Sequence, residues 1–223
     1  MTLSWMDLPA FVIFQIAGFT DLDAPALEAE AASLSPTAGE RRRRDYAAGR
    51  NLARRLLVPL GCGDHALVQT AAGAPRWPAG VVGSISHCRD RVFAAVAPAD
   101  RADAIGIDIE NVARFHDGLA HHILTTQERA RLPADKAERR RRMAIAFSAK
   151  EAFYKHQSVL FGAPLTFQDA EIHIDARRQG FSVVMTNPGE HGRFAARTMG
   201  FYAVDDAHAA TMVLRCAAPD AVP

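Results

Sequence analysis

Two neighbouring stretches, "GSISH" at residues 83–87 and "IGIDIE" at residues 105–110, are polar where the hydrophobic pattern predicts strands. They belong to the runs "VVGSISH", "VFAAVA" and "AIGIDIE", which are short, rich in β-branched residues and separated by turn residues. We expect these three runs to form a meander. A core strand does not need two serines and a histidine, or two acids with one residue between them, so these polar side chains require an explanation.

The elements outside these strands alternate in an α+β order. A strand is expected at residues 10–19, and a helix at 41–61, where leucines recur every four residues. Beyond residue 110, the pattern predicts a short helix at 124–132, a long helix at 135–157 and four strands between 170 and 216. We therefore expect two halves, 1–110 and 111–223, with the same order of elements but no sequence repeat.

Composition limits the class of protein. The chain has 223 residues, of which 49% are hydrophobic and 23% charged, as is usual for a globular protein, and a net charge of +1 implies no overall attraction to nucleic acid. The three cysteines are far apart and form no C-x-x-C pair, which favours reduced thiols in a cytoplasmic protein. The apolar run at the amino terminus is interrupted by Asp7 and Gln15, so we expect neither a signal peptide nor a membrane span.

The two acids of "IGIDIE" are expected to act together. Asp108 and Glu110 are two residues apart on a strand, so both carboxylates emerge on the same face of the sheet. Two such carboxylates repel each other unless a cation lies between them, and oxygen ligands suit Mg²⁺. The alternative is a solvated strand end that carries two acids.

The helix that contains "FSAKEAFYKH" places a third acid in an apolar stripe. Glu151 lies in the stripe formed by Met143, Phe147 and Tyr154, and Lys155 follows it by four residues. A carboxylate in an apolar stripe is costly to bury unless a metal ion or a lysine compensates its charge. The alternative is a Glu–Lys pair on the helix surface, which would contribute a few tenths of a kcal/mol.

Donors for phosphate are predicted in two further places. In "GSISH", Ser86 and His87 are good donors at a strand end, and the nucleophile elbow that a catalytic Ser–His pair would need is missing. On the helix at 41–61, Arg43, Arg50 and Arg54 share a face, with Arg42 close by. The alternative for these arginines is a solvated face. A nucleic-acid module would need stacking aromatics there, and Tyr46 is the one aromatic residue of this helix.

Taken together, the motifs G-R, W-P-x-G, G-S-I-S-H-C, G-I-D-I-E and F-S-A-K-E-A-x-Y-K resemble the 4′-phosphopantetheinyl transferases, and most closely the group that activates enterobactin-type siderophore synthetases. The resemblance covers about residues 42–156. It implies a pseudo-dimer of two similar α/β halves, each a small antiparallel-rich sheet packed with a long helix, with coenzyme A bound between the halves. A single chain that carries both halves suggests a monomer.

The resemblance further implies roles for individual residues. Mg²⁺, or alternatively Mn²⁺, would be held by Asp108, Glu110 and Glu151. Coenzyme A would be contacted by Arg42, Arg50, Ser86, His87 and Lys155, with Lys155 on the pyrophosphate. Relatives often carry a base before the W-P loop, where "TAAGAP" at residues 70–75 has none, and Arg76 is the candidate substitute. Glu151 is the first candidate for the proton acceptor and Glu128 the second, although Thr125 and Glu128 also match a capping box.

The implied reaction is the transfer of phosphopantetheine from coenzyme A to a serine of an acyl or peptidyl carrier protein, with release of 3′,5′-ADP. Carrier recognition is expected in residues 111–132, which follow the strand of the acids. Two alternatives remain: a Mg²⁺-dependent hydrolase of coenzyme A or nucleotide pyrophosphates, and a non-catalytic relative that binds coenzyme A. The pathway of the carrier is left open.

Overall fold

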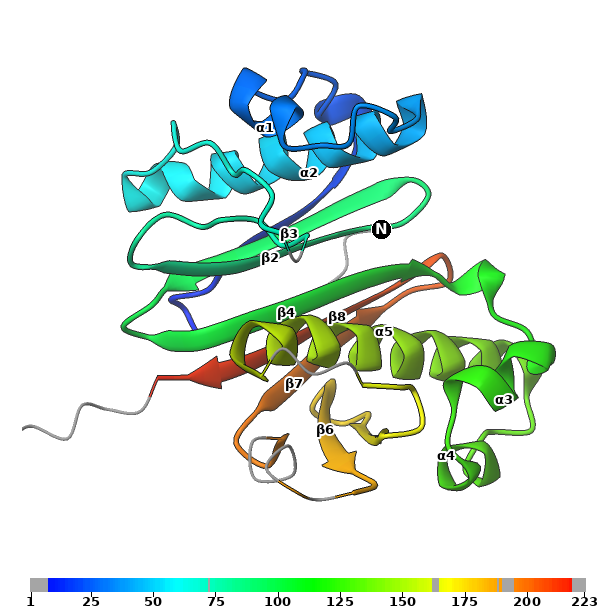
Figure 1. The fold of residues 1–223 in the computed structure, drawn as a ribbon. Coiled ribbons are helices and arrows are strands. Elements are labelled where there is room, and N and C mark those ends of the chain that lie inside the picture. Colours follow the sequence, from blue (N-terminus) through cyan, green and yellow to red (C-terminus); the bar gives the residue numbers. More distant parts are fainter. Residues whose placement is uncertain (1–7, 72, 162–164, 188, 190–194, 218–223) are drawn as a thin grey trace, which may run out of the picture.

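The computed structural model describes residues 8–71, 73–161, 165–187, 189 and 195–217. These residues form four layers (Figure 1): the helix α2 (Glu40–Leu57), a three-stranded sheet, a five-stranded sheet and the helix α5 (Lys136–Phe161). Each sheet is antiparallel, and each has one long helix on its outer face. The predicted α+β fold of two halves, each a sheet with a long helix, is confirmed.

The three-stranded sheet has the order β1-β3-β2, with β1 at Ile13–Gly18, β2 at Val81–His87 and β3 at Arg91–Pro98. Its central strand β3 is buried on both faces, because successive side chains point to opposite sides. Val92, Ala94 and Val96 pack in the cluster that contains the leucines of α2, whereas Phe93, Ala95 and Ala97 face the second sheet. This strand therefore connects two of the three hydrophobic clusters.

The five-stranded sheet has the order β4-β8-β7-β6-β5. Its strands are β4 (Ala102–Asn111), β5 (Ala170–Asp175), β6 (Gly180–Met185), β7 (Met199–Val204) and β8 (His208–Cys216). The four strands expected between residues 170 and 216 are thus present. The predicted meander is correct for β2 and β3 but wrong for β4, whose backbone pairs with β8 at the other end of the chain.

Packing between the layers explains why β4 leaves the first sheet. Ile105, Ile107 and Ile109 point from β4 into the same cluster as Phe93 and its neighbours on β3. The three isoleucines can cover this face of the three-stranded sheet only if β4 lies in a second layer opposite it. A strand beside β3 in the same sheet could not do so. The edges of β2 and β4 still meet, because the amide of Ile107 donates a hydrogen bond to Ser84 Oγ at 3.2 Å.

Short helices complete the fold: α1 (Glu28–Ala32), α3 (Ala120–Ile123), α4 (Thr126–Ala130) and the single 3-10 turns Phe19–Asp21, Val58–Leu60, Val112–Arg114 and Asp117–Leu119. The predicted boundary at residue 110 falls near the end of β4, a strand of the second sheet, and the division into 1–110 and 111–223 stays a prediction. Cys62, Cys88 and Cys216 form no disulfide with one another in the described part of the chain. Within the described residues, no helix combines the length and apolar character needed to cross a membrane.

Candidate active site

The acids of β4 lie on the face that meets α5. Because Ile107 and Ile109 point into the core between the sheets, Asp108 and Glu110 point the other way, and both are buried. The helix approaches this face closely at Gly106, where an added Cβ would collide with the backbone of Ala152. Gly106 thus allows the α5 turn that carries Glu151 and Lys155 to lie directly against the strand of acids.

Lys155 joins the helix to both sheets. Its Nζ donates hydrogen bonds to Asp108 Oδ1 at 2.8 Å, to Ser86 Oγ at 2.8 Å and to the carbonyl of Ile107 at 3.1 Å. Ser86 in turn donates its hydroxyl hydrogen to Asp108 Oδ1 at 2.8 Å. Residues from β2, β4 and α5 therefore converge on one carboxylate oxygen.

The second oxygen of Asp108 is the clearest sign of a cation site. Asp108 Oδ2 is buried and has no hydrogen-bond partner, an arrangement that costs free energy unless something else binds it. Burial, and then the charge of Asp108, raises the pKa of Glu110 to about 7, and the same two causes raise the pKa of Glu151. Asp108 thus raises the pKa of two neighbouring carboxyl groups and has an unpartnered oxygen, which suits a hard divalent cation such as Mg²⁺, although the ligand atoms of the three acids do not all lie within 4.8 Å of one another.

Arg114 is a residue of this cluster that the sequence did not predict. Its Nη1 pairs with Glu110 Oε2, and its guanidinium lies over the rings of Phe115 and Phe147. The charge of Arg114 also lowers the pKa of Glu151. The available signal was a single arginine four residues after Glu110, and nothing in the sequence showed that the chain turns back there through the 3-10 turn Val112–Arg114.

The predicted coenzyme A residues separate into two groups. His87 lies at the end of β2, and its Nδ1 is 3.9 Å from Asp45 Oδ2. Burial lowers the pKa of His87, and the positive charges of Lys155, Arg42 and Arg41 lower it further. The negative charge of Asp45 acts in the opposite direction and raises this pKa. His87, Lys155 and the exposed Arg42 therefore form one electropositive neighbourhood beside Asp108. Such a neighbourhood suits an anionic ligand.

The other predicted arginines lie elsewhere. Arg50 is buried against the ring of Tyr46 and donates to the carbonyl of Leu67 at 3.1 Å, although its Nη2 has no partner. Arg54 pairs with the buried Glu30 inside the first half. Arg76 is exposed on the loop before β2. The basic face predicted on α2 is thus divided between the core and the surface, because Arg50 and Arg54 have buried partners.

A cavity of about 560 Å³ opens beside Lys155, between the edges of β2 and β4. It is lined by backbone and side chains of Thr70, Gly73, Ala74, Pro75, Trp77, Gly83, Ser84, Ile85, Ile105, Lys155 and Ser158. Within "TAAGAP", Ala72 lies outside the described residues, and Arg76 is not among the lining residues. The cavity extends from Trp77 of the W-P loop to Lys155, and Asp108, Glu110 and Glu151 are not among its lining residues.

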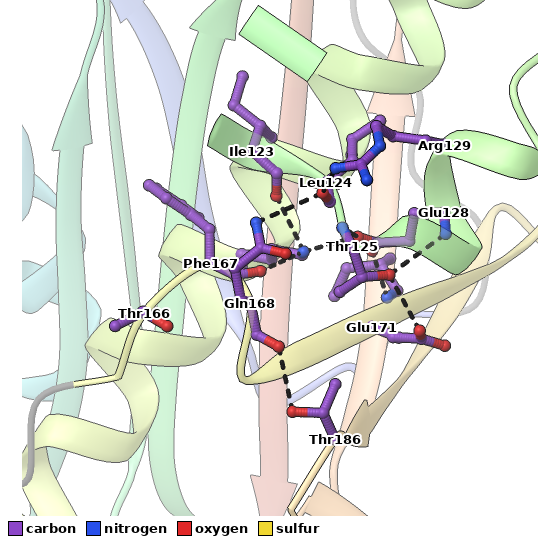
Figure 2. A network of polar contacts seen from close by, with 12 residues as sticks. Ile123, Leu124, Thr125, Glu128, Arg129, Thr166, Phe167, Gln168, Glu171 and Thr186 are labelled. Carbon is purple, nitrogen blue, oxygen red and sulfur yellow. Dashed lines mark hydrogen bonds and ion pairs between the residues drawn. The ribbon is translucent and has the colours of Figure 1, made fainter. Parts of the chain in front are cut away.

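Glu128 lies in a separate network (Figure 2). Its Oε2 accepts hydrogen bonds from the amide of Thr125 at 2.8 Å and from Lys150 Nζ at 2.7 Å, and its Oε1 accepts one from the amide of Ile172 at 2.8 Å. Lys150 also donates to the carbonyls of Ile123 and Phe167. The capping box is confirmed, and both oxygens of Glu128 have hydrogen-bond partners, whereas Oδ2 of Asp108 has none.

Comparisons with known proteins agree with this arrangement. Residues 29–97 match the family model of the 4′-phosphopantetheinyl transferase N-terminal domain, and residues 104–211 match that of the 4′-phosphopantetheinyl transferase superfamily. The chain is 36% identical to the 4′-phosphopantetheinyl transferase Svp of Streptomyces mobaraensis. The 188 aligned residues cover 82% of this chain and 76% of that protein. This chain belongs to the 4′-phosphopantetheinyl transferase superfamily.

Two further members of the superfamily show the range of the likeness. The transferase PptT of Mycobacterium tuberculosis is 32% identical over 203 residues, which cover 86% of this chain and 82% of that protein. Enterobactin synthase component D of Salmonella typhimurium is 36% identical over 126 residues, which cover 53% of this chain and 50% of that protein. The resemblance inferred from the motifs, and the enzyme class that it implied, are confirmed.

Proposed function

We propose that this 4′-phosphopantetheinyl transferase uses Asp108, Glu110 and Glu151 to hold Mg²⁺ while phosphopantetheine passes from coenzyme A to a carrier serine. The observation that carries the proposal is the buried and unpartnered Oδ2 of Asp108 beside two carboxyl groups whose pKa values are raised. When bound, Mg²⁺ would neutralise charge on the pyrophosphate. Oxygen-only ligands also leave Mn²⁺ as a usable substitute.

The chain's own residues would position the reactants. Lys155 is held between Ser86 and Asp108, on the wall of the cavity, where its ammonium group can meet the pyrophosphate of coenzyme A. Phosphoryl transfer needs mainly in-line placement and charge neutralisation, and a rigidly held cation serves both. The cavity between β2 and β4 would receive the rest of coenzyme A.

Glu151 is our candidate for the group that accepts the serine proton. Its carboxyl group is partly exposed, and without a bound metal burial raises its pKa towards neutral pH, as suits a general base. Glu128 is a poorer candidate, because accepting a proton there would break its ion pair with Lys150 or its bonds to backbone amides. A base needs a free lone pair near the nucleophile, which favours Glu151.

The partner is proposed to be a carrier domain of a peptide or polyketide synthetase. The likeness to an enterobactin synthase component supports this class. Residues 111–132 begin at the end of β4, next to Glu110, and run through Arg114 to α4, so they border the acid cluster. We propose that this border receives the carrier, and that one chain suffices for activity because both halves of the site are present in it.

Mass spectrometry of carrier domains incubated with the protein, coenzyme A and Mg²⁺ tests the function. A carrier that gains one phosphopantetheine group, and no gain with Asp108→Asn, is the expected result. Release of 3′,5′-ADP without a carrier would instead indicate a hydrolase. Binding of coenzyme A with no reaction on acyl, peptidyl or polyketide carriers would indicate a non-catalytic relative.

A further inference from the structure

A sulfur, a carboxylate and an imidazole meet at the end of the molecule beyond the acid cluster. Cys88, Asp90 and His208 each offer a ligand atom, and these atoms lie within 4.8 Å of one another. Cys88 and Asp90 belong to the turn between β2 and β3, whereas His208 is the first residue of β8. The cluster therefore joins a turn of the first sheet to a strand of the second.

The three side chains already contact one another. His208 Nε2 lies 3.1 Å from each oxygen of Asp90, and Cys88 Sγ lies 3.6 Å from Asp90 Oδ1. His208 is buried and Cys88 half-buried, but 45% of the Asp90 side chain is exposed. An ion could therefore reach the cluster from solvent without opening the fold.

We propose that Cys88, Asp90 and His208 form a binding site for a thiophilic divalent cation, with Zn²⁺ as the reference ion. Zn²⁺ in proteins takes cysteine sulfur, histidine nitrogen and aspartate oxygen in a tetrahedral arrangement. The sulfur separates this site from the acid cluster, whose ligands are all oxygens and suit harder cations. Water from the exposed side of Asp90 would supply the fourth ligand.

Surrounding groups hold the ligands in place. Asn111 Nδ2 donates to Asp90 Oδ1 at 2.8 Å, while the side-chain oxygen Oδ1 of Asn111 accepts from the backbone amide of Arg89 at 3.3 Å. Asp205 Oδ1 accepts hydrogen bonds from the backbone amides of Ala207 at 2.8 Å and His208 at 2.7 Å, and it lies 4.0 Å from His208 Nδ1, too far for a hydrogen bond to the ring. Asp205 therefore fixes the backbone of His208 and places a negative charge behind its imidazole, where histidine ligands of zinc frequently have a carboxylate.

One group opposes the ion. Arg91 Nη1 lies 3.4 Å from Asp90 Oδ2 and would have to move aside, so Arg91→Gln should bind the metal more tightly than the wild type. The thiol is also protonated before binding, because burial raises the pKa of Cys88 to about 11. Binding therefore breaks the S–H bond, forms a bond from sulfur to the metal and releases one proton to solvent.

The position suggests a structural clamp. The turn that carries Cys88 directly follows Ser86 and His87, and Asn111 directly follows Glu110. A metal ion held there would fix the end of β2 against the start of β8, and with it the two edges of the candidate active site. Binding of an ion to the native state alone also stabilises it by mass action.

Cobalt titration of the metal-free, full-length protein tests this site, with Mg²⁺ in excess to occupy the acid cluster. Bound Co²⁺ should give a thiolate charge-transfer band, and Zn²⁺ should displace it at one equivalent per chain. Cys88→Ser should remove the band, and Asp90→Asn, at an exposed position, should weaken zinc binding about 10-fold or more. Zinc at about 100 times its Kd should raise the Tm of the wild type by roughly 5–10 °C.

Two controls separate this site from others. Cys216→Ser removes an exposed thiol of β8 and should keep the band, as should Glu110→Gln in the acid cluster. No thiolate band in the wild type, or equal zinc affinity in the wild type, Cys88→Ser and Asp90→Asn, would overturn the proposal. Because the readout is metal binding rather than transfer, this result and the result of the carrier assay are independent.

Discussion

Lys155 Nζ lies 2.8 Å from Asp108 Oδ1, although the two residues are 47 positions apart in the chain. The lysine comes from α5 and the acid from β4, and Ser86 of β2 donates to the same oxygen. This pairing leaves the other oxygen of Asp108 buried and available. A single carboxylate therefore connects the lysine that we assign to the pyrophosphate with the metal that we assign to the three acids.

The first prediction concerns the acid cluster. Asp108→Ala, Glu110→Ala and Glu151→Ala should each reduce transfer on the order of 10²-fold or more, because each removes one of three charges that would hold the metal. Transfer to a carrier domain, followed by mass spectrometry, measures the loss. Asp103→Ala is the matched control, since Asp103 lies on the same strand but pairs with Arg215, and it should leave the rate nearly unchanged. Near-normal transfer by Asp108→Ala would exclude the metal assignment.

The second prediction concerns Lys155. Lys155→Met should raise the KM for coenzyme A and lower kcat, while Mg²⁺ binds at least as tightly as before, because the ammonium group no longer competes for Asp108 Oδ1. Lys155→Arg keeps the charge and should recover part of the activity. Calorimetric titration with Mg²⁺ and steady-state kinetics measure the two effects separately. A parallel loss of Mg²⁺ affinity would show that Lys155 acts mainly by shaping the acid cluster.

The third prediction concerns the 3′-phosphate of coenzyme A. His87 and Arg42 are donors beside Lys155 that the pyrophosphate does not require, and a charge-assisted hydrogen bond contributes roughly 1.5–3 kcal/mol. We therefore expect dephospho-coenzyme A to bind at least about 10-fold more weakly than coenzyme A. His87→Ala should narrow this difference. Calorimetric titration of coenzyme A and of dephospho-coenzyme A into the wild type and His87→Ala measures this difference. Equal affinities of the wild type for the two ligands would show that His87 and Arg42 do not bind the 3′-phosphate.

The fourth prediction concerns the buried pair of Lys150 and Glu128. Burial lowers the pKa of Lys150, and Glu128 compensates by raising it. Lys150→Met should lower the free energy of unfolding by about 3–5 kcal/mol, because it leaves a buried carboxylate without its partner. The double variant Lys150→Met/Glu128→Gln should lose less than the sum of the two single changes. Urea denaturation measures the stability of the single and double variants. The control is Arg141→Met, which breaks an exposed ion pair with Asp206 and should change the free energy of unfolding little.

The fifth prediction concerns acid pH and His156. Burial lowers the pKa of this fully buried imidazole, which stacks on Phe153, from 6.5 to about 3. Below pH 6.5 the unfolded chain therefore binds a proton that the folded chain does not, so stability falls as the pH drops towards 3. The loss from this group should reach about 2 kcal/mol at pH 5. The stability of His156→Gln should fall less than that of the wild type between pH 6.5 and pH 5. If the urea midpoints of His156→Gln and the wild type depended on pH in the same way, the assignment of this loss to His156 would be contradicted.

Local periodicity was enough to predict much of this protein. The alternation of "IGIDIE" placed Asp108 and Glu110 on one face, since side chains of a strand alternate whatever its partners are. The period of the long helix placed Glu151 among apolar side chains for a similar reason, and the capping box of Thr125 and Glu128 needs only four consecutive residues. Five short motifs in order were sufficient for the family.

Only the tertiary structure decided which of these elements meet. The pairing of β4 with β8, the contact of Lys155 with Asp108 and the return of Arg114 to Glu110 depend on how the layers pack. Helix periodicity also does not show that Arg50 and Arg54 have buried partners. It gives the direction in which a side chain leaves the helix, but not which other part of the chain packs there. Long-range partners are selected by the burial of whole faces, here the three isoleucines of β4 against Phe93, and no local pattern records that choice.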